Sequence, residues 1–201
     1  MRVSCLGRND RIYSSNVYLL LGDWSRIGDV NALIDVGADP AVLPFVERAP
    51  TGVGKRKVDL VILTHRHYDH ALMLPEIKAR YGARVLAWGK ADDPVDESVA
   101  DGQRIRVADD EIEVIHTPAH TDDSICLYGV ASGVLFAGDT PLLSHSTDGA
   151  YTLAFVEALG RIASRPVSAI YFGHGEPLTE RCNERLEASL RNVLAAGRLA
   201  G

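Results

Sequence analysis

The sequence predicts a mixed α/β protein in which two β-sheets pack together and helices cover their outer faces. Short apolar runs with β-branched residues recur along the chain, and stretches with helical apolar spacing follow them repeatedly. Residues 59–64, DLVILT, are apolar throughout, as expected for a central strand buried on both faces. Layers of sheets and helices are an arrangement in which such a set of elements buries its apolar faces.

The other elements are predicted one by one from the same patterns. Strands are expected at 11–22, 31–37, 83–88, 111–117, 124–129, 133–139 and 169–173, with a hairpin loop between the first two. Helices are expected at 38–49, 75–81, 152–163 and 178–196. Pro75 suits the first position of its helix, and Gly82 ends that helix.

Composition narrows the class of protein. The 201 residues include 46% apolar and 24% charged residues and show no linker or repeat, so a single domain over 1–201 is expected. The net charge of −6, without a block of Lys or Arg, argues against a nucleic-acid partner. We find no apolar leader and no membrane-span-length segment, which favours a cytoplasmic protein without a membrane partner. The oligomeric state is left open.

The three cysteines are consistent with this compartment. Cys5, Cys126 and Cys182 are scattered and form no CxxC pair, so a disulfide framework or a zinc knuckle is not expected. We expect all three to be small buried core residues in a reducing environment.

A cluster of histidines follows the strand at 59–64. The segment THRHYDH places His65, His67, Asp69 and His70 within six positions. Imidazole nitrogens and carboxylate oxygens are ligands that zinc and iron prefer. His65 and His67 can lean toward one point, while Asp69 and His70 would aim at a second point nearby. One metal rarely takes four ligands from six consecutive residues, so the cluster favours two neighbouring metals.

Three other strand ends carry further candidate ligands. His120 follows the strand at 111–117, Asp139 ends the strand at 133–139, and His174 follows the strand at 169–173. Loops on a rigid scaffold commonly build active sites in this way. The alternative, a solvated loop that happens to carry histidines, does not account for four strand ends. His116 is expected to be a packed structural residue.

Taken in order, these motifs resemble those of the metallo-β-lactamase superfamily. THRHYDH is similar to its HxHxDH motif, TPAHT to its TPGHT motif, FAGDT to its GDT-type strand end and YFGHG to the segment of its last histidine. LIDVG, which contains Asp35, resembles its early strand–Asp–turn element. The resemblance implies an αββα four-layer sandwich with the site at one edge of the two sheets.

The resemblance also implies a set of ligands for two divalent metal ions. It places one metal on His65, His67 and His120 and the other on Asp69, His70 and His174, with Asp139 bridging both. It implies that Asp35 is an acceptor that orients a ligating histidine or the nearby backbone. Zinc is the expected metal, with iron or manganese as alternatives.

The implied activity is metal-dependent hydrolysis of a small molecule. A metal-bridging hydroxide would attack an ester, thioester, lactone or phosphodiester, with Asp69 as the catalytic residue that holds the hydroxide and takes its proton. An aspartate at the bridging position, here Asp139, is similar to the arrangement in glyoxalase II, lactonases and the phosphodiesterase branch. Its presence disfavours β-lactam hydrolysis. A glutathione thioester is disfavoured because only 27 residues follow His174, and RNA cleavage because the chain is short and acidic. The alternatives are a persulfide dioxygenase-like enzyme with one iron and a non-catalytic metal-binding member.

Two residues are predicted at the rim of the site. Trp24, in the hairpin loop 22–30, is expected either to cover substrate as part of a flap or to fold back on the sheet. His145 is expected to contact substrate or to be exposed without a role.

Departures from the family motifs leave two more questions. Leu72 and Met73 stand where the family often has small glycines, and they either narrow the pocket or pack in the core. Asp122 and Asp123, beside His120, are expected to face solvent.

Overall fold

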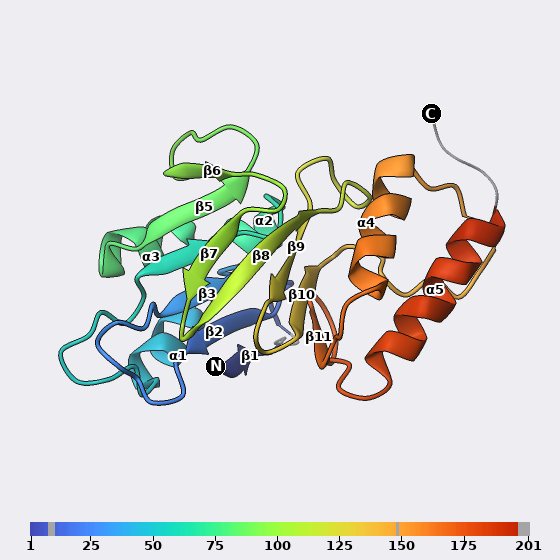
Figure 1. Cartoon of the computed structure of the whole chain (residues 1–201). Helices are drawn as coiled ribbons and strands as arrows, with labels where there is room; N and C mark the ends of the chain where they lie inside the picture. The colour runs from blue at the N-terminus through green and yellow to red at the C-terminus, as the bar shows by residue number, and fades with distance from the viewer. Residues whose placement is uncertain (8–10, 148, 197–201) are drawn as a thin grey trace.

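The computed structural model describes residues 1–7, 11–147 and 149–196 and contains two β-sheets (Figure 1). The first sheet has the strand order β1 (Arg2–Leu6), β2 (Val17–Leu21), β3 (Ala32–Ile34), β4 (Leu60–Ile62), β5 (Arg84–Trp88) and β6 (Glu97–Val99). The second has the order β11 (Ala169–Phe172), β10 (Val134–Gly138), β9 (Ile125–Gly129), β8 (Asp110–His116) and β7 (Arg104–Val107). Strands β3 to β6 are parallel, as are β10 and β11, and the other pairs are antiparallel.

The layers follow from the alternation of side chains along each strand. In β2, Leu19 packs toward α1 (Val42–Arg48) and α3 (Leu74–Tyr81), whereas Leu20 packs against the second sheet. On the far face of the second sheet, side chains of β8, β9 and β10 pack against α4 (Leu153–Ala163) and α5 (Cys182–Ala196). Figure 1 shows these two helices beside β10 and β11, away from the first sheet. The predicted αββα sandwich is therefore confirmed.

One edge of the sandwich collects the ends of several strands. Asp35 follows β3, His65 follows β4, Asp139 follows β10 and His174 follows β11. The short helix α2 (Tyr68–Ala71) begins directly after His67. A main-chain hydrogen bond joins the two sheets at this edge: the amide of Asn16, just before β2, donates to the carbonyl of Gly173, just after β11, at 2.7 Å. The two sheets are thus fixed relative to one another at this edge.

Several elements differ from the sequence-based expectations. The predicted strand 11–22 is regular only over β2, the predicted helix 178–196 begins at Cys182, and β1, β6 and β7 were not predicted. The edge strand β1 is largely exposed, so its sequence carries polar residues and lacks a buried-strand signal. Cys5 lies on this strand and is exposed, which corrects the expectation that it is buried; Cys126 and Cys182 are buried. No helix within the described residues is long and apolar enough to cross a membrane.

Candidate metal centre

Seven side chains meet at the shared edge of the two sheets. They come from the turn after β4, the short helix α2, the loop after β8, the end of β10 and the end of β11, and they are His65, His67, Asp69, His70, His120, Asp139 and His174. His65, Asp69 and His70 are buried, whereas His67 and His120 are exposed. The structure therefore brings together every residue that the sequence singled out as a metal ligand, with one open side.

The ligand atoms form three overlapping groups, each with its atoms within 4.8 Å of one another. The groups are His65–His67–His120, Asp69–His70–His174 and His65–His70–Asp139. The two outer groups match the two ligand sets implied by the sequence, and the third group shares residues with both.

Asp139 lies between the two outer groups. Its Oδ1 is 3.4 Å from His70 Nε2, and its Oδ2 is 3.5 Å from His174 Nε2 and 3.7 Å from His120 Nε2. One carboxylate therefore faces imidazoles of both groups, as a bridging ligand must.

Two buried nitrogens test whether metals fit this cluster. His65 Nε2 and His70 Nε2 are buried and have no hydrogen-bond partner among the described residues. A buried polar atom without a partner is costly, and imidazole nitrogens with carboxylates are a preferred donor set for divalent zinc. Cations in the cluster would give both nitrogens a partner, so the residues present fit two divalent metal ions.

Asp35 fixes the orientation of His70. Its Oδ2 lies 2.8 Å from His70 Nδ1, and its two oxygens accept hydrogen bonds from the Thr64 amide and hydroxyl, each at 2.8 Å. Asp35 has a φ of 55°, a left-handed conformation in which Asp is tolerated better than most residues. With Nδ1 held by this carboxylate, Nε2 of His70 is directed into the cluster.

The charges of the cluster shift the pKa values of its buried groups. Burial and, next in size, the positive charge of His70 together lower the pKa of His65 to about 4. Burial would also lower the pKa of His70, but the carboxylates of Asp35 and Asp139 outweigh it and raise that pKa to about 10. Burial would raise the pKa of Asp139, and the adjacent His70 instead holds it below its usual value. The carboxylates of Asp35 and Asp139 therefore favour positive charge at the centre of the cluster, as a bound cation would supply.

Three residues that the sequence did not indicate as part of the site, Asn16, Gly173 and Asp123, support the segments that carry its ligands. The side-chain amide of Asn16 donates to the carbonyls of Phe172 and Gly175, at 3.1 and 2.8 Å, and so clamps both sides of His174. A side chain on Gly173 would place its Cβ 2.1 Å from Asp139 Oδ1. The sequence signals are modest: a polar residue opening an apolar run, and a glycine directly before the last histidine.

Asp123 is the third, and it corrects the expectation that it faces solvent. Its Oδ2 accepts a hydrogen bond of 3.0 Å from the amide of Arg66, which lies between His65 and His67. The loop that carries His120 is thereby tied to the segment that carries the first two ligands.

The structure places Trp24 far from the metal cluster. Strand β2 begins next to the site, where the amide of Ser15 donates to the carbonyl of Asp69, and loop 22–30 follows its other end. Five strand residues span roughly 17 Å. The prediction that Trp24 lies at the rim is wrong, and the indole does not fold back on the sheet either, since it is 80% exposed.

The two remaining histidines also lie outside the cluster. His145 is exposed and lines a hollow beside α5, with Leu178 and Arg185; none of the seven candidate ligands is among the described residues that line it. The structure therefore does not place His145 at the metal cluster. The ring of His116 stacks on Trp88 with centroids 3.8 Å apart, in agreement with a packed structural role.

The family of the chain is shown by sequence comparison. The family model of the metallo-beta-lactamase superfamily matches residues 11–90 and 87–174, which include all seven candidate ligands. The chain therefore belongs to the metallo-β-lactamase superfamily.

Individual proteins with similar sequences or structures include two enzymes and one crystal structure. Over 169 residues the chain is 37% identical to hydroxyacylglutathione hydrolase from Methylobacterium nodulans, covering 80% of this chain and 63% of that protein. Over 200 residues it is 26% identical to atrochrysone carboxyl ACP thioesterase from Aspergillus fumigatus, covering 94% of this chain and 61% of that protein. The chain thus spans less than two thirds of the length of these relatives. The crystal structure of ETHE1 from Myxococcus xanthus superposes with a TM-score of 0.68 at 23% identity, covering 96% of this chain and 88% of that one, which shows a shared fold.

Proposed function

We propose that this protein is a metal-dependent hydrolase and that its substrates are small thioesters, within the wider set of esters, lactones and phosphodiesters. The observation that carries the proposal is the position of Asp139 between the groups His65–His67–His120 and Asp69–His70–His174. The thioester class is supported by the names of two relatives, one a hydrolase of an acylated glutathione and the other a thioesterase.

In such a reaction each residue of the cluster would have its own role. When two divalent metals are bound, zinc foremost, they would supply hydroxide at neutral pH and polarise the scissile carbonyl. The carboxylate of Asp69 is buried, with its Oδ2 3.0 Å from His174 Nε2, and in this proposal it holds the attacking water and accepts its proton. Asp35 keeps His70 in one tautomer, and the exposed His67 and His120 leave the cluster open to substrate.

A panel of substrates tests the proposal. Zinc-loaded protein should hydrolyse acyl thioesters of N-acetylcysteamine, should lose this activity after exhaustive chelation, and should regain it when Zn²⁺ is added back. His65→Ala and Asp139→Ala should reduce the rate by orders of magnitude, because His65 belongs to two of the ligand groups and Asp139 lies between the two outer groups. Activity that survives chelation, or no hydrolysis of any thioester, ester, lactone or phosphodiester, would refute the proposal.

A further inference from the structure

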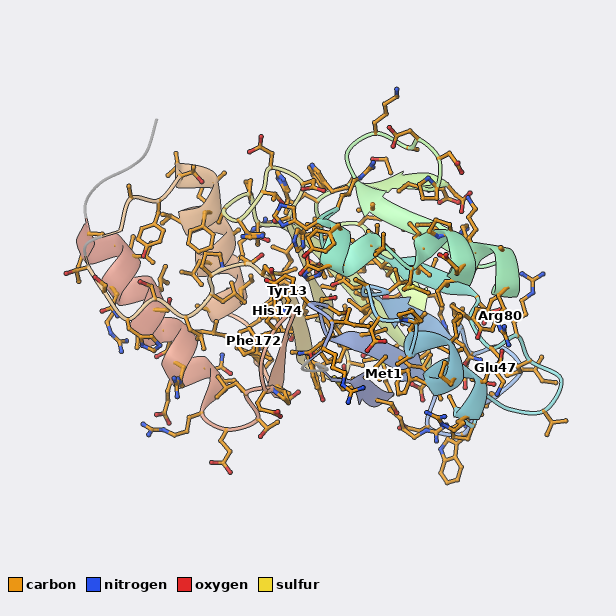
Figure 2. The ribbon with its side chains drawn as sticks, turned by 180° about the vertical axis from the view of Figure 1, so that it is seen from behind. Met1, Tyr13, Glu47, Arg80, Phe172 and His174 are labelled. Carbon is orange, nitrogen blue, oxygen red and sulfur yellow. The ribbon has the colours of Figure 1, made fainter. Side chains whose placement is uncertain are left out.

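Two exposed aromatic side chains adjoin the metal cluster. The ring of Tyr13 stacks on His174, with centroids 5.2 Å apart and an interplanar angle of 24°, and Figure 2 shows the two side by side. Tyr13 also lies 6.4 Å, centroid to centroid, from Tyr68, whose chain neighbours are the candidate ligands His67 and Asp69. The two tyrosines are 60% and 61% exposed, although each is a large ring that could be buried.

Leu72 continues this surface one helical turn beyond Tyr68. Its amide donates to the carbonyl of Tyr68 at 2.8 Å, and its side chain is 55% exposed. The adjacent Met73 is only 6% exposed and packs in the core of the first sheet. Core packing therefore explains Met73 but not Leu72, and it leaves Leu72 available to a ligand.

An apolar hollow opens on the same side. Its volume is about 330 Å³, and Tyr68, Leu72, Pro75, Pro94 and Val95 are among the residues that line it. Arg66 also lines it, but its guanidinium donates to the Asp92 carboxylate at 2.7 Å and to the carbonyl of Trp88 at 3.2 Å. The guanidinium of Arg66 is thus paired within the protein, and the other residues that line the hollow offer it aliphatic and aromatic surface.

We propose that Tyr13, Tyr68 and Leu72, here called the apolar shelf, together with this hollow, bind an apolar arm of the substrate. Exposed apolar side chains that form a continuous surface usually mark a binding site, and the volume suits one arm of a small molecule. The shelf is continuous with the cluster through the Tyr13–His174 stack, so an arm bound there places the rest of the molecule at the metals. The identity of the bond that is cleaved rests on the proposed function, whereas the binding of the apolar arm does not.

A pair of non-hydrolysable ligands tests the shelf without catalysis. The probes are the S-methyl and S-hexyl thioethers of N-acetylcysteamine, titrated calorimetrically into zinc-loaded protein. Full burial of a methylene is worth about fourfold in affinity, so partial burial of the longer chain should make the hexyl probe bind roughly tenfold more tightly than the methyl probe.

Variants localise the effect. The double variant Tyr13→Ser/Tyr68→Ser should bind the hexyl and methyl probes with equal affinity. The double variant Tyr13→Phe/Tyr68→Phe should keep the tighter binding of the hexyl probe. Leu72→Ser, which alters no residue adjacent in sequence to a candidate metal ligand, should reduce the hexyl-to-methyl affinity ratio about threefold, within the range expected for a partly buried leucine. Trp24→Ser removes an apolar side chain that is even more exposed, at 80%, at the other end of β2, and it should change neither affinity. Equal affinity of native protein for the two probes, or a loss in Trp24→Ser as large as in Leu72→Ser, would overturn the shelf.

The shelf and the proposed hydrolase activity fail in different ways. Tighter binding of the hexyl probe without hydrolysis of any thioester would support the apolar shelf and refute thioester hydrolysis. Hydrolysis of acetyl and hexanoyl thioesters with equal kcat/KM, together with equal probe binding, would leave the hydrolase standing and remove the shelf.

Discussion

Gly173 lies directly before His174, and the space beside its Cα is filled by two candidate ligands. A Cβ there would approach Asp139 Oδ1 to 2.1 Å and His70 Cε1 to 2.6 Å, both far inside van der Waals contact. These atoms belong to side chains that face each other across the cluster, so neither can retreat without leaving its place.

We therefore expect Gly173→Ala to lower metal affinity at least about tenfold, the scale observed when groups that orient ligands are lost. Competition with a chromophoric chelator measures this directly. Gly160→Ala is the matched control, because nothing lies within 4 Å of that Cβ and the residue is inside α4. The control should bind metal normally and gain about 0.5–1 kcal/mol of stability. Normal metal binding by Gly173→Ala would contradict the geometry of the cluster.

At the residue scale, the ligands could be identified from sequence and their supports could not. Each candidate ligand lies in the loop or short helix that follows a strand with a clear apolar pattern, so residue type and position together carried the signal. Asn16 and the carbonyl of Phe172 are 156 positions apart, and no local pattern relates them. Only the packing of the two sheets creates that contact.

At the scale of elements, one hydrogen bond joins two ligand-bearing loops. Asp123→Ala removes the acceptor of the Arg66 amide and should weaken metal binding to the group His65–His67–His120 about tenfold. Asp122→Ala is the matched control, because the Asp122 carbonyl, and not its carboxylate, contacts His116. Metal titration of both variants checks this, and equal affinities would show that the two aspartates are equivalent.

The turn between β9 and β10 provides a test of pH dependence away from the metals. The buried carboxylate of Asp110 accepts hydrogen bonds from the amides of Glu111, Ala131 and Ser132 and from the Ser132 hydroxyl, at 2.7 to 3.0 Å. Burial would raise the pKa of Asp110, but these hydrogen bonds outweigh it and lower that pKa. Because the folded pKa lies below the unfolded value of about 4, the stabilisation is complete above pH 4 and is lost as the pH falls through the folded pKa.

Asp110→Asn should accordingly lower the free energy of unfolding by about 1–3 kcal/mol at pH 7 and by less at pH 3. Urea unfolding of native and variant protein at both pH values measures the difference. A cost that is the same at pH 7 and pH 3 would show that ionisation of Asp110 does not contribute.

The predictability of the elements followed their burial. Strands such as β4 and β9, buried along their whole length, were predicted from apolar runs, whereas the exposed edge strand β1 and the three-residue β6 were missed. Short or edge strands are stabilised by their pairing with a neighbour, which a local sequence window does not contain.

On the scale of the whole molecule, the site exists because two sheets end at the same edge. The first sheet supplies Asp35 and the segment from His65 to His70, and the second supplies His120, Asp139 and His174. The error over Trp24 arose at this scale, since a hairpin has two ends and only the direction of β2 decides which end faces the metals. The motifs named the strands of the site, but only the assembled sheets showed the direction of each.

The number of metal ions bound per chain tests the central claim most directly. Elemental analysis of native protein should give a value near two, and His70→Ala and His174→Ala should each give a value near one with hydrolysis reduced by orders of magnitude, because both residues belong to the Asp69–His70–His174 group. Native protein that is fully active with a single iron, consumes oxygen and is unaffected by His174→Ala would contradict the account.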